Sequence, residues 1–109
     1  MNGKLITVAS DFSPSPAGRF LADGPFPGEK FREEILLPAL REHEDVIVDL
    51  DGTSGMGSSF LEEAFGGLVR LAGFSEPQLR QRLHIRSSRQ TYEQRIWKYI
   101  HKARPGARH

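Results

Sequence analysis

The sequence of 109 residues contains no cysteine. This absence excludes disulfides, zinc–thiolate sites and a thiol nucleophile, and it favours a reducing compartment such as the cytoplasm. Long apolar runs are also absent, since none approaches the roughly 20 residues that a membrane-spanning helix requires. The first residues, MNGKLITVASDF, lack the apolar core of a signal peptide. We therefore expect a cytoplasmic protein with no membrane segment.

Signals for a metal or a cofactor are also missing. The four histidines, at positions 43, 84, 101 and 109, do not have the spacing of a metal site. The glycine-rich segment GTSGMGSS (52–59) lacks the lysine that completes a phosphate-binding loop of the GxxxxGK[ST] type. The sequence thus predicts no metal and no cofactor.

Charge is divided unevenly along the chain, although the net charge is only +1. Residues 1–77 carry six basic and thirteen acidic side chains, a net charge of −7, whereas residues 78–109 carry nine basic and one acidic, a net charge of +8. We favour pairing of the basic segment with the acidic body. The alternative is a basic face that binds nucleic acid, formed by Arg80, Arg82, Arg86, Arg95, Lys98 and Lys102.

The length predicts one domain over 1–109, with an ordered core at about 4–103 and a frayed tail at 104–109. Apolar periodicity and turn residues divide this core into alternating elements. We expect strands at 4–9, 19–22, 46–50 and 82–87, helices at 29–44, 58–73 and 89–104, and a helical turn capped by Ser75 at 75–81. Pro38 should kink or restart the first helix.

The resulting order, β-β-α-β-α-β-α, predicts a small α/β sandwich around a mixed, mostly parallel sheet. The run VIVDL (46–50) is apolar enough for its central strand. The loop that follows therefore lies at the carboxyl end of a central strand, where such folds bind ligands and partners.

That loop begins with DLDGT, which resembles the nucleophile motif of phosphatases of the haloacid dehalogenase type. In such a phosphohydrolase Asp49 would attack phosphorus and Asp51 would act as acid and base. The mechanism also requires a lysine and later acidic residues for magnesium, yet the only acids after Gly67 are Glu76 and Glu93. We interpret both aspartates as turn-forming residues and keep the phosphohydrolase as an alternative.

The longer segment VIVDLDGTSGMGSSFL (46–61) resembles the signature of STAS domains, the fold of anti-sigma-factor antagonists. Asp49 takes the place of the aspartate at the strand end and Ser58 that of the phosphorylated serine, while Gly57 and Phe60 differ from the signature. Over residues 4–103 the chain resembles the STAS-like family of unknown function called DUF4325, most specifically in GSSFLEEAFGGL (57–68).

This resemblance implies a non-enzymatic regulatory module that binds a protein partner. The implied partner is a histidine-kinase-like ATPase of the anti-sigma type or a similar signalling protein, and Ser58 is the candidate phosphoacceptor. The predicted docking surface is the loop with the first turn of the next helix, formed by Gly55, Met56, Gly57, Ser58, Ser59, Glu62 and Glu63.

Two local features of the helix at 58–73 also carry predictions. Ser59 and Glu62 have the S-x-x-E spacing of a capping box, which would give Ser59 a structural role. Gly66 and Gly67 adjoin in mid-helix at a cost of about 1 kcal/mol each relative to alanine. Such a pair indicates a close approach, either of the chain's own sheet or of a partner, including a second copy in a homodimer.

Overall fold

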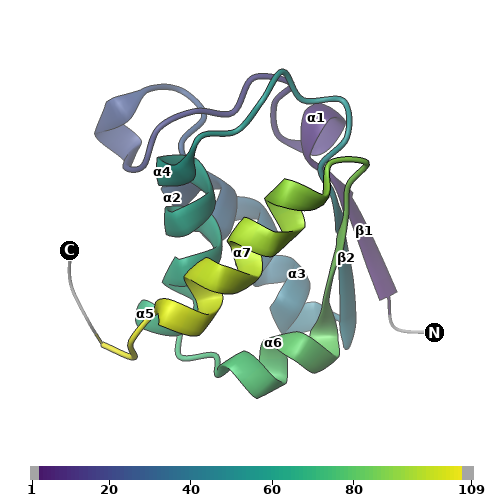
Figure 1. Cartoon of the computed structure of the whole chain (residues 1–109), viewed down its shortest axis with the longest axis vertical. Coiled ribbons are helices and arrows are strands. Elements are labelled where there is room, and N and C mark those ends of the chain that lie inside the picture. The colour runs from purple at the N-terminus through teal and green to yellow at the C-terminus, as the bar shows by residue number, and fades with distance from the viewer. Residues whose placement is uncertain (1–2, 107–109) are drawn as a thin grey trace.

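Three parallel strands form the sheet of the computed structural model, which describes residues 3–106. The strands β1 (Gly3–Thr7), β2 (Asp45–Asp49) and β3 (Leu83–Arg86) lie side by side in that order (Figure 1). The register pairs Ile6 with Val48 and Val48 with Ile85. The run VIVDL thus contributes the central strand, as its apolar composition predicts.

The helices gather on one face of this sheet (Figure 1). Because consecutive strands are added in one direction and parallel crossovers are right-handed, both connections carry their helices to the same side. Val46, Val48 and Leu83 are buried on that side. On the opposite face Leu5 is 47% exposed, so the fold has two layers.

Two long helical segments, each with a π-helical turn in its middle, form most of the helical layer. The first comprises α2 (Gly28–Phe31), η2 (Arg32–Leu36) and α3 (Leu37–Glu42), and the second comprises α4 (Ser58–Leu61), η3 (Glu62–Gly66) and α5 (Gly67–Arg70). The other helices are α1 (Val8–Asp11), the 3-10 turn η1 (Leu21–Asp23), α6 (Glu76–Arg82) and α7 (Gln90–Lys102).

The α/β class is confirmed, but the strand predicted at 19–22 is wrong. The Asp23 carboxylate accepts the N–H groups of Arg19 (3.2 Å) and Phe20 (2.7 Å), and Glu29 accepts that of Leu21 (2.9 Å). These carboxylates bind the backbone N–H groups that would otherwise donate to a neighbouring strand. Consequently Leu21–Asp23 forms a 3-10 turn, and the sheet is wholly parallel rather than mixed.

Pro38 acts as its lack of an N–H group predicts. The helix widens into the π-helical turn before it, and α-helix resumes at Leu37 with Pro38 in the first turn, where proline is tolerated. The cap of α6 is also as predicted, because Ser75 and Gln78 form a reciprocal capping box.

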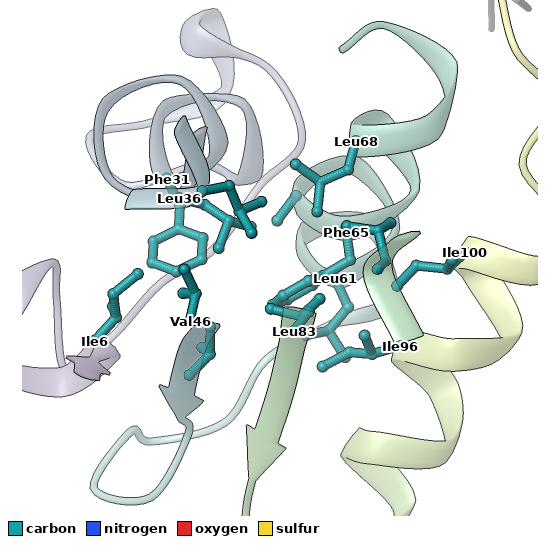
Figure 2. Close-up of a cluster of buried hydrophobic side chains, with 14 of the residues drawn as sticks. Ile6, Phe31, Leu36, Val46, Leu61, Phe65, Leu68, Leu83, Ile96 and Ile100 are labelled. Carbon is teal, nitrogen blue, oxygen red and sulfur yellow. The ribbon is translucent and has the colours of Figure 1, made fainter. Parts of the chain in front are cut away.

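The core lies between the sheet and the helices (Figure 2). Side chains from every layer meet there, and the sheet, the two π-containing segments and α7 contribute Ile6, Val46, Leu83, Phe31, Leu36, Leu61, Phe65, Leu68, Ile96 and Ile100, all at most 1% exposed. Apolar residues at helical spacing in each long helix therefore face the core, whereas Leu71 is 58% exposed.

The end of the chain is only partly described. Of the tail predicted at 104–109, residues 107–109 lie outside the described residues, as do residues 1–2 of the predicted domain. The N–H of Gly106 donates to the carbonyl of Arg70 at 2.8 Å, so this part of the tail is attached to the end of α5.

Candidate functional site at the carboxyl edge of the sheet

The connection from β2 to α4 begins where the central strand ends, and its own side chains fold it. The N–H of Asp51 donates to the Asp49 carboxylate (2.9 Å), and the Thr53 hydroxyl donates to the carbonyl of Leu50 (3.0 Å). Gly52, with φ of 93°, supplies a left-handed conformation that other residues rarely adopt. The loop is thus a built turn at the carboxyl edge of the sheet.

Asp51 also joins this loop to the segment after β3. Its carboxylate accepts the N–H and the hydroxyl of Ser88, both at 2.9 Å. These two hydrogen bonds, the backbone one foremost, lower the pKa of Asp51, and the charge of Arg89 adds to the effect. Asp49 accepts a local backbone N–H, as the turn-forming interpretation predicts, whereas the Asp51 carboxylate bonds Ser88, which is 37 positions away in the sequence.

A cleft of about 340 Å³ lies between the two loops. It is lined by Leu50, Asp51, Gly52, Thr53, Ser88, Arg89 and Tyr92. The Tyr92 hydroxyl accepts the N–H of Met56 (3.2 Å) and a guanidinium N–H of Arg89 (3.3 Å). Tyr92 therefore anchors the loop to α7 just before Ser58.

The sequence predicted neither Ser88 as a residue of the site nor the contact of Tyr92 with the loop. The strand register explains how Asp51 and Ser88 meet, because it pairs Asp49 with Arg86. Asp51 and Ser88 each follow these partners by two residues. That register has no local signature in the sequence, because residues 51 and 88 are 37 positions apart.

The capping box predicted for Ser59 and Glu62 is wrong. The N-cap is Gly57, two residues before Ser59, and the helix begins at Ser58. Glu62 instead accepts hydrogen bonds from Arg19 and Arg70. Ser58 and Ser59 are both exposed in the first turn, and the N-cap residue, Gly57, has no side chain that could cap the helix.

The two glutamates of the predicted docking surface belong to a cluster of ion pairs behind that turn. Glu62 pairs with Arg19 and Arg70, and Glu63 pairs with Arg32 at 2.8 Å. Burial alone would raise the pKa of Glu62, but the hydrogen bonds from Arg70 and Arg19 outweigh burial and hold the pKa below its ordinary value. Both carboxylates are thus neutralised by guanidinium groups.

The glycine pair in this helix makes room for the ion pairs. A Cβ on Gly67 would lie 2.2 Å from Nη1 of Arg32, and one on Gly66 would lie 2.8 Å from Oε2 of Glu62. The close approach predicted there is real, but the approaching groups are the chain's own charged side chains. Neither the sheet nor a second copy is needed to explain the two glycines.

The structure divides the predicted docking surface into outer and inner parts. Gly57, Ser58 and Ser59 are exposed, and Gly55 and Glu62 are half-buried. Met56 and Glu63 are only 5% and 1% exposed, so their side chains belong to the interior. The accessible surface is therefore the loop backbone and the first turn of α4.

The basic C-terminal segment is partly paired with the acidic body. The Arg80 guanidinium lies 4.3 Å from the centroid of the Trp97 ring and pairs with Glu76 at 3.1 Å. Arg82 donates to the carbonyls of Leu40, His43 and Glu44. The other four residues of the alternative nucleic-acid surface are exposed, namely Arg86, Arg95, Lys98 and Lys102.

Two further features bear on the class of protein. Within residues 3–106, no cluster of three or more His, Asp or Glu side chains is arranged to hold a metal ion. No helix in this described range combines the length and the apolar character needed to cross a membrane.

Comparison with known proteins gave one result. A family model described as a STAS-like domain of unknown function (DUF4325) matches residues 27–93, which include α2 to β3 and the start of α7. The curated proteins and the solved structures gave no significant match. The matched range contains the whole loop and helix start described above.

Proposed function

The chain belongs to the family of STAS-like domains of unknown function (DUF4325), and we propose that it is a non-enzymatic regulatory module that binds a protein partner. Its docking surface is the loop Gly55–Ser59 together with the exposed first turn of α4. The partner class is a histidine-kinase-like ATPase or a similar signalling protein, as the STAS resemblance implies. The switch is phosphorylation of Ser58.

The observation that carries this proposal is the exposed, uncapped start of the helical segment Ser58–Arg70. Its N-cap residue, Gly57, has no side chain that could cap it, so the first N–H groups of the helix are open to a visiting acceptor. The segment follows the loop that leaves the carboxyl end of the central strand, and the Tyr92 hydroxyl fixes that loop. A rigid, exposed helix start at this edge is a suitable contact for a partner.

The charge around Ser58 supports its role as phosphoacceptor. A phosphate group adds a charge of about −1.5 to −2 at neutral pH, and the positive end of the helix dipole stabilises it. Glu62 and Glu63 would otherwise repel it, but Arg19, Arg32 and Arg70 neutralise both carboxylates. The modification would come from a kinase. The Ser58 Oγ–P bond forms as the bond between the γ-phosphorus of ATP and its β–γ bridging oxygen breaks, ADP leaves, and the hydroxyl proton passes to a base of the kinase.

Variants at Ser58 test this function on the full chain. Tagged wild type, Ser58→Ala, Ser58→Glu and the neighbouring control Ser59→Ala would be used to capture partners from cells of the source organism. We expect one protein that binds wild type, Ser58→Ala and Ser59→Ala, and binds Ser58→Glu at least about tenfold more weakly. Equal capture by Ser58→Glu would contradict the switch, and equal capture by a bulky Ser58→Trp variant would contradict docking at this turn.

A further inference from the structure

The sheet has an open edge along β1. Within residues 3–106, no strand pairs with β1 on the side away from β2. Figure 1 shows β1 at the right-hand margin of the molecule, with no helix or strand beyond it. An edge strand of this kind presents backbone N–H and C=O groups to which a further strand can bind.

Local side chains close one end of this edge. The N–H of Thr7 donates to the Asp11 carboxylate at 2.8 Å, and the carbonyl of Thr7 accepts the Ser10 hydroxyl at 3.5 Å. Alternate residues of a strand direct their backbone groups to opposite sides. The N–H and C=O of Leu5 therefore face the open edge, as those of Thr7 do. The free part of the edge is thus the first half of β1, where Leu5 is 47% exposed.

A groove of about 350 Å³ runs beside this edge, on the face of the sheet that the helices cover. It lies between β1 and the helical segment formed by η2 and α3, and the apolar part of its lining consists of Ile6, Ile35, Pro38 and Ala39. No residue of β2 lines it, so the groove lies outside the central strand. A strand that paired with β1 would direct every second side chain towards it.

The charge of the groove favours a basic occupant. Asp11, Glu34 and Glu42 contribute three carboxylates to its lining and Lys4 contributes one ammonium group, which gives a net charge of −2 with His43 neutral. The three acidic residues are exposed. In the part of the chain that the structure describes, none of them forms an ion pair. Their charge is therefore available to a basic side chain that enters the groove.

We propose that this groove binds an extended, basic peptide segment of a protein partner, which pairs with the free edge of β1 as a fourth strand. Backbone hydrogen bonds to Leu5 hold the segment, and every second side chain enters the groove. An arginine or lysine at these positions packs its aliphatic stem on Ile35 and Pro38 and extends its charged group to Glu34 or Glu42. The start of α4 does not line the groove, so this inference does not depend on the proposed docking surface or on its phosphorylation.

A synthetic peptide tests the proposal on the full chain. The probe is an acetylated and amidated hexapeptide of alternating valine and arginine, and its control carries glutamate in place of arginine. With the arginine peptide, the amide NMR signals of β1 and α3 should shift, and hydrogen exchange at the Leu5 amide should slow at least about tenfold at saturation because this amide gains an acceptor. The glutamate peptide should cause neither change. Unmoved β1 signals at about 1 mM arginine peptide, a concentration that reveals even a weak complex, would overturn the proposal.

Charge variants distinguish the groove from general attraction between a basic peptide and the acidic body. Glu34→Gln/Glu42→Gln removes two carboxylates of the lining, whereas the control Glu44→Gln/Glu93→Gln removes two exposed carboxylates outside it. Both double variants change the net charge equally. We expect the first to weaken binding of the arginine peptide at least about tenfold and the second to weaken it less than about twofold.

Two results of these titrations would contradict a basic peptide as the occupant. Equal weakening by the two double variants would mean that the groove does not select the arginine side chains. Shifts of the β1 signals that depend on the concentration of the chain itself, without peptide, would mean that a second copy occupies this edge.

Discussion

Arg32 and Glu63 form an ion pair in the interior of the molecule, with Nη1 and Oε2 2.8 Å apart and side chains 2% and 1% exposed. Each residue lies in the π-helical turn of one of the two long helical segments. The pair therefore joins the segment that precedes β2 to the segment that follows it. It fixes the helix whose first turn we propose as the docking surface.

Removing the buried Glu63 carboxylate should destabilise the fold much more than removing the exposed Glu33 carboxylate, although both pair with Arg32. Glu63→Gln leaves Arg32 without its buried counter-charge, and we expect a loss of about 3–5 kcal/mol in the free energy of unfolding. Arg32 also pairs with Glu33 at 3.0 Å, but Glu33 is 53% exposed, so Glu33→Gln should cost less than about 1 kcal/mol. Urea titrations of both variants measure the two losses, and similar values would contradict the account of the buried pair.

The two adjacent glycines should respond differently to a methyl group. In Gly67→Ala the new Cβ meets the buried side chain of Arg32, whose Nη1, Cζ and Cδ lie within 3.1 Å of it, and we expect a loss of about 1–3 kcal/mol from overpacking. In Gly66→Ala the nearest atoms are the ends of the Glu62 and Arg70 side chains. Because alanine favours helix by about 1 kcal/mol over glycine, this variant should be nearly neutral.

Thermal or urea unfolding of Gly66→Ala and Gly67→Ala compares two substitutions with the same helix propensity. If Gly67→Ala is as stable as Gly66→Ala, Arg32 is free to move, and its ion pair with Glu63 does not fix the helix.

The Tyr92 hydroxyl should control the loop before Ser58. Tyr92→Phe removes the acceptor for the Met56 N–H, and we expect a loss of about 0.5–1.5 kcal/mol together with faster hydrogen exchange at the Met56 amide. Tyr99→Phe, a half-buried tyrosine of the same helix, is the matched control. Unchanged exchange at Met56 in Tyr92→Phe would show that the loop is fixed by other contacts.

Acid sensitivity should depend in part on Ser88. The pKa of Asp51 is lowered in the fold, so the stability that this carboxylate contributes is present above its ordinary pKa of about 3.9 and is lost as the pH falls through the lower folded pKa. Ser88→Ala removes the hydroxyl bond but keeps the stronger backbone bond, and the pKa of Asp51 should rise part of the way to its ordinary value. NMR titration of the carboxyl carbon measures this rise.

Ser87→Ala is the control for that titration, because the Ser87 hydroxyl accepts the N–H of Arg89 and does not contact Asp51. If the pKa of Asp51 is equally low in Ser88→Ala and in the wild type, the Ser88 hydroxyl does not contribute to lowering it.

The C-terminal segment should bind nucleic acid weakly. Arg80 and Arg82 are engaged with Glu76, Trp97 and backbone carbonyls. Of the six cations of the alternative surface, this leaves Arg86, Arg95, Lys98 and Lys102 exposed on β3 and α7. We expect no retention of DNA or RNA in gel shifts at about 150 mM salt, where contacts to phosphate are largely screened. Tight binding that falls steeply with salt and is lost in Lys98→Gln/Lys102→Gln would favour the alternative function.

The sequence predicted those elements whose conformation follows from the local pattern of apolar residues. The apolar run 46–50, the alternation at 82–87 and the helical spacing of Tyr92, Ile96 and Ile100 each gave the observed element because burial of one face is read directly from periodicity. The strand predicted at 19–22 failed, since its four residues are too few for the pattern to outweigh the side-chain acceptors Asp23 and Glu29.

The local structure of residues 55–63 was predicted, but the partners of their side chains were not. These residues form a loop and a helix start after the central strand, as the strand–loop–helix pattern indicates. The partners of Glu62 and Glu63, however, are Arg19 and Arg32, which are 43 and 31 positions away in the sequence. The local S-x-x-E pattern therefore predicted a capping box, whereas Glu62 in fact forms ion pairs with Arg19 and Arg70.

Hydrogen–deuterium exchange of the native complex would show whether a partner docks on the start of α4. The chain, isolated from its own cells with its bound partner, would be compared with the free chain, residue by residue. We predict slowed exchange in the loop Gly55–Ser59 and the first turn of α4, with little change on the exposed face of β1 and β3. Protection confined to that sheet face or to the basic side of α7, with the start of α4 unchanged, would contradict the proposed docking surface.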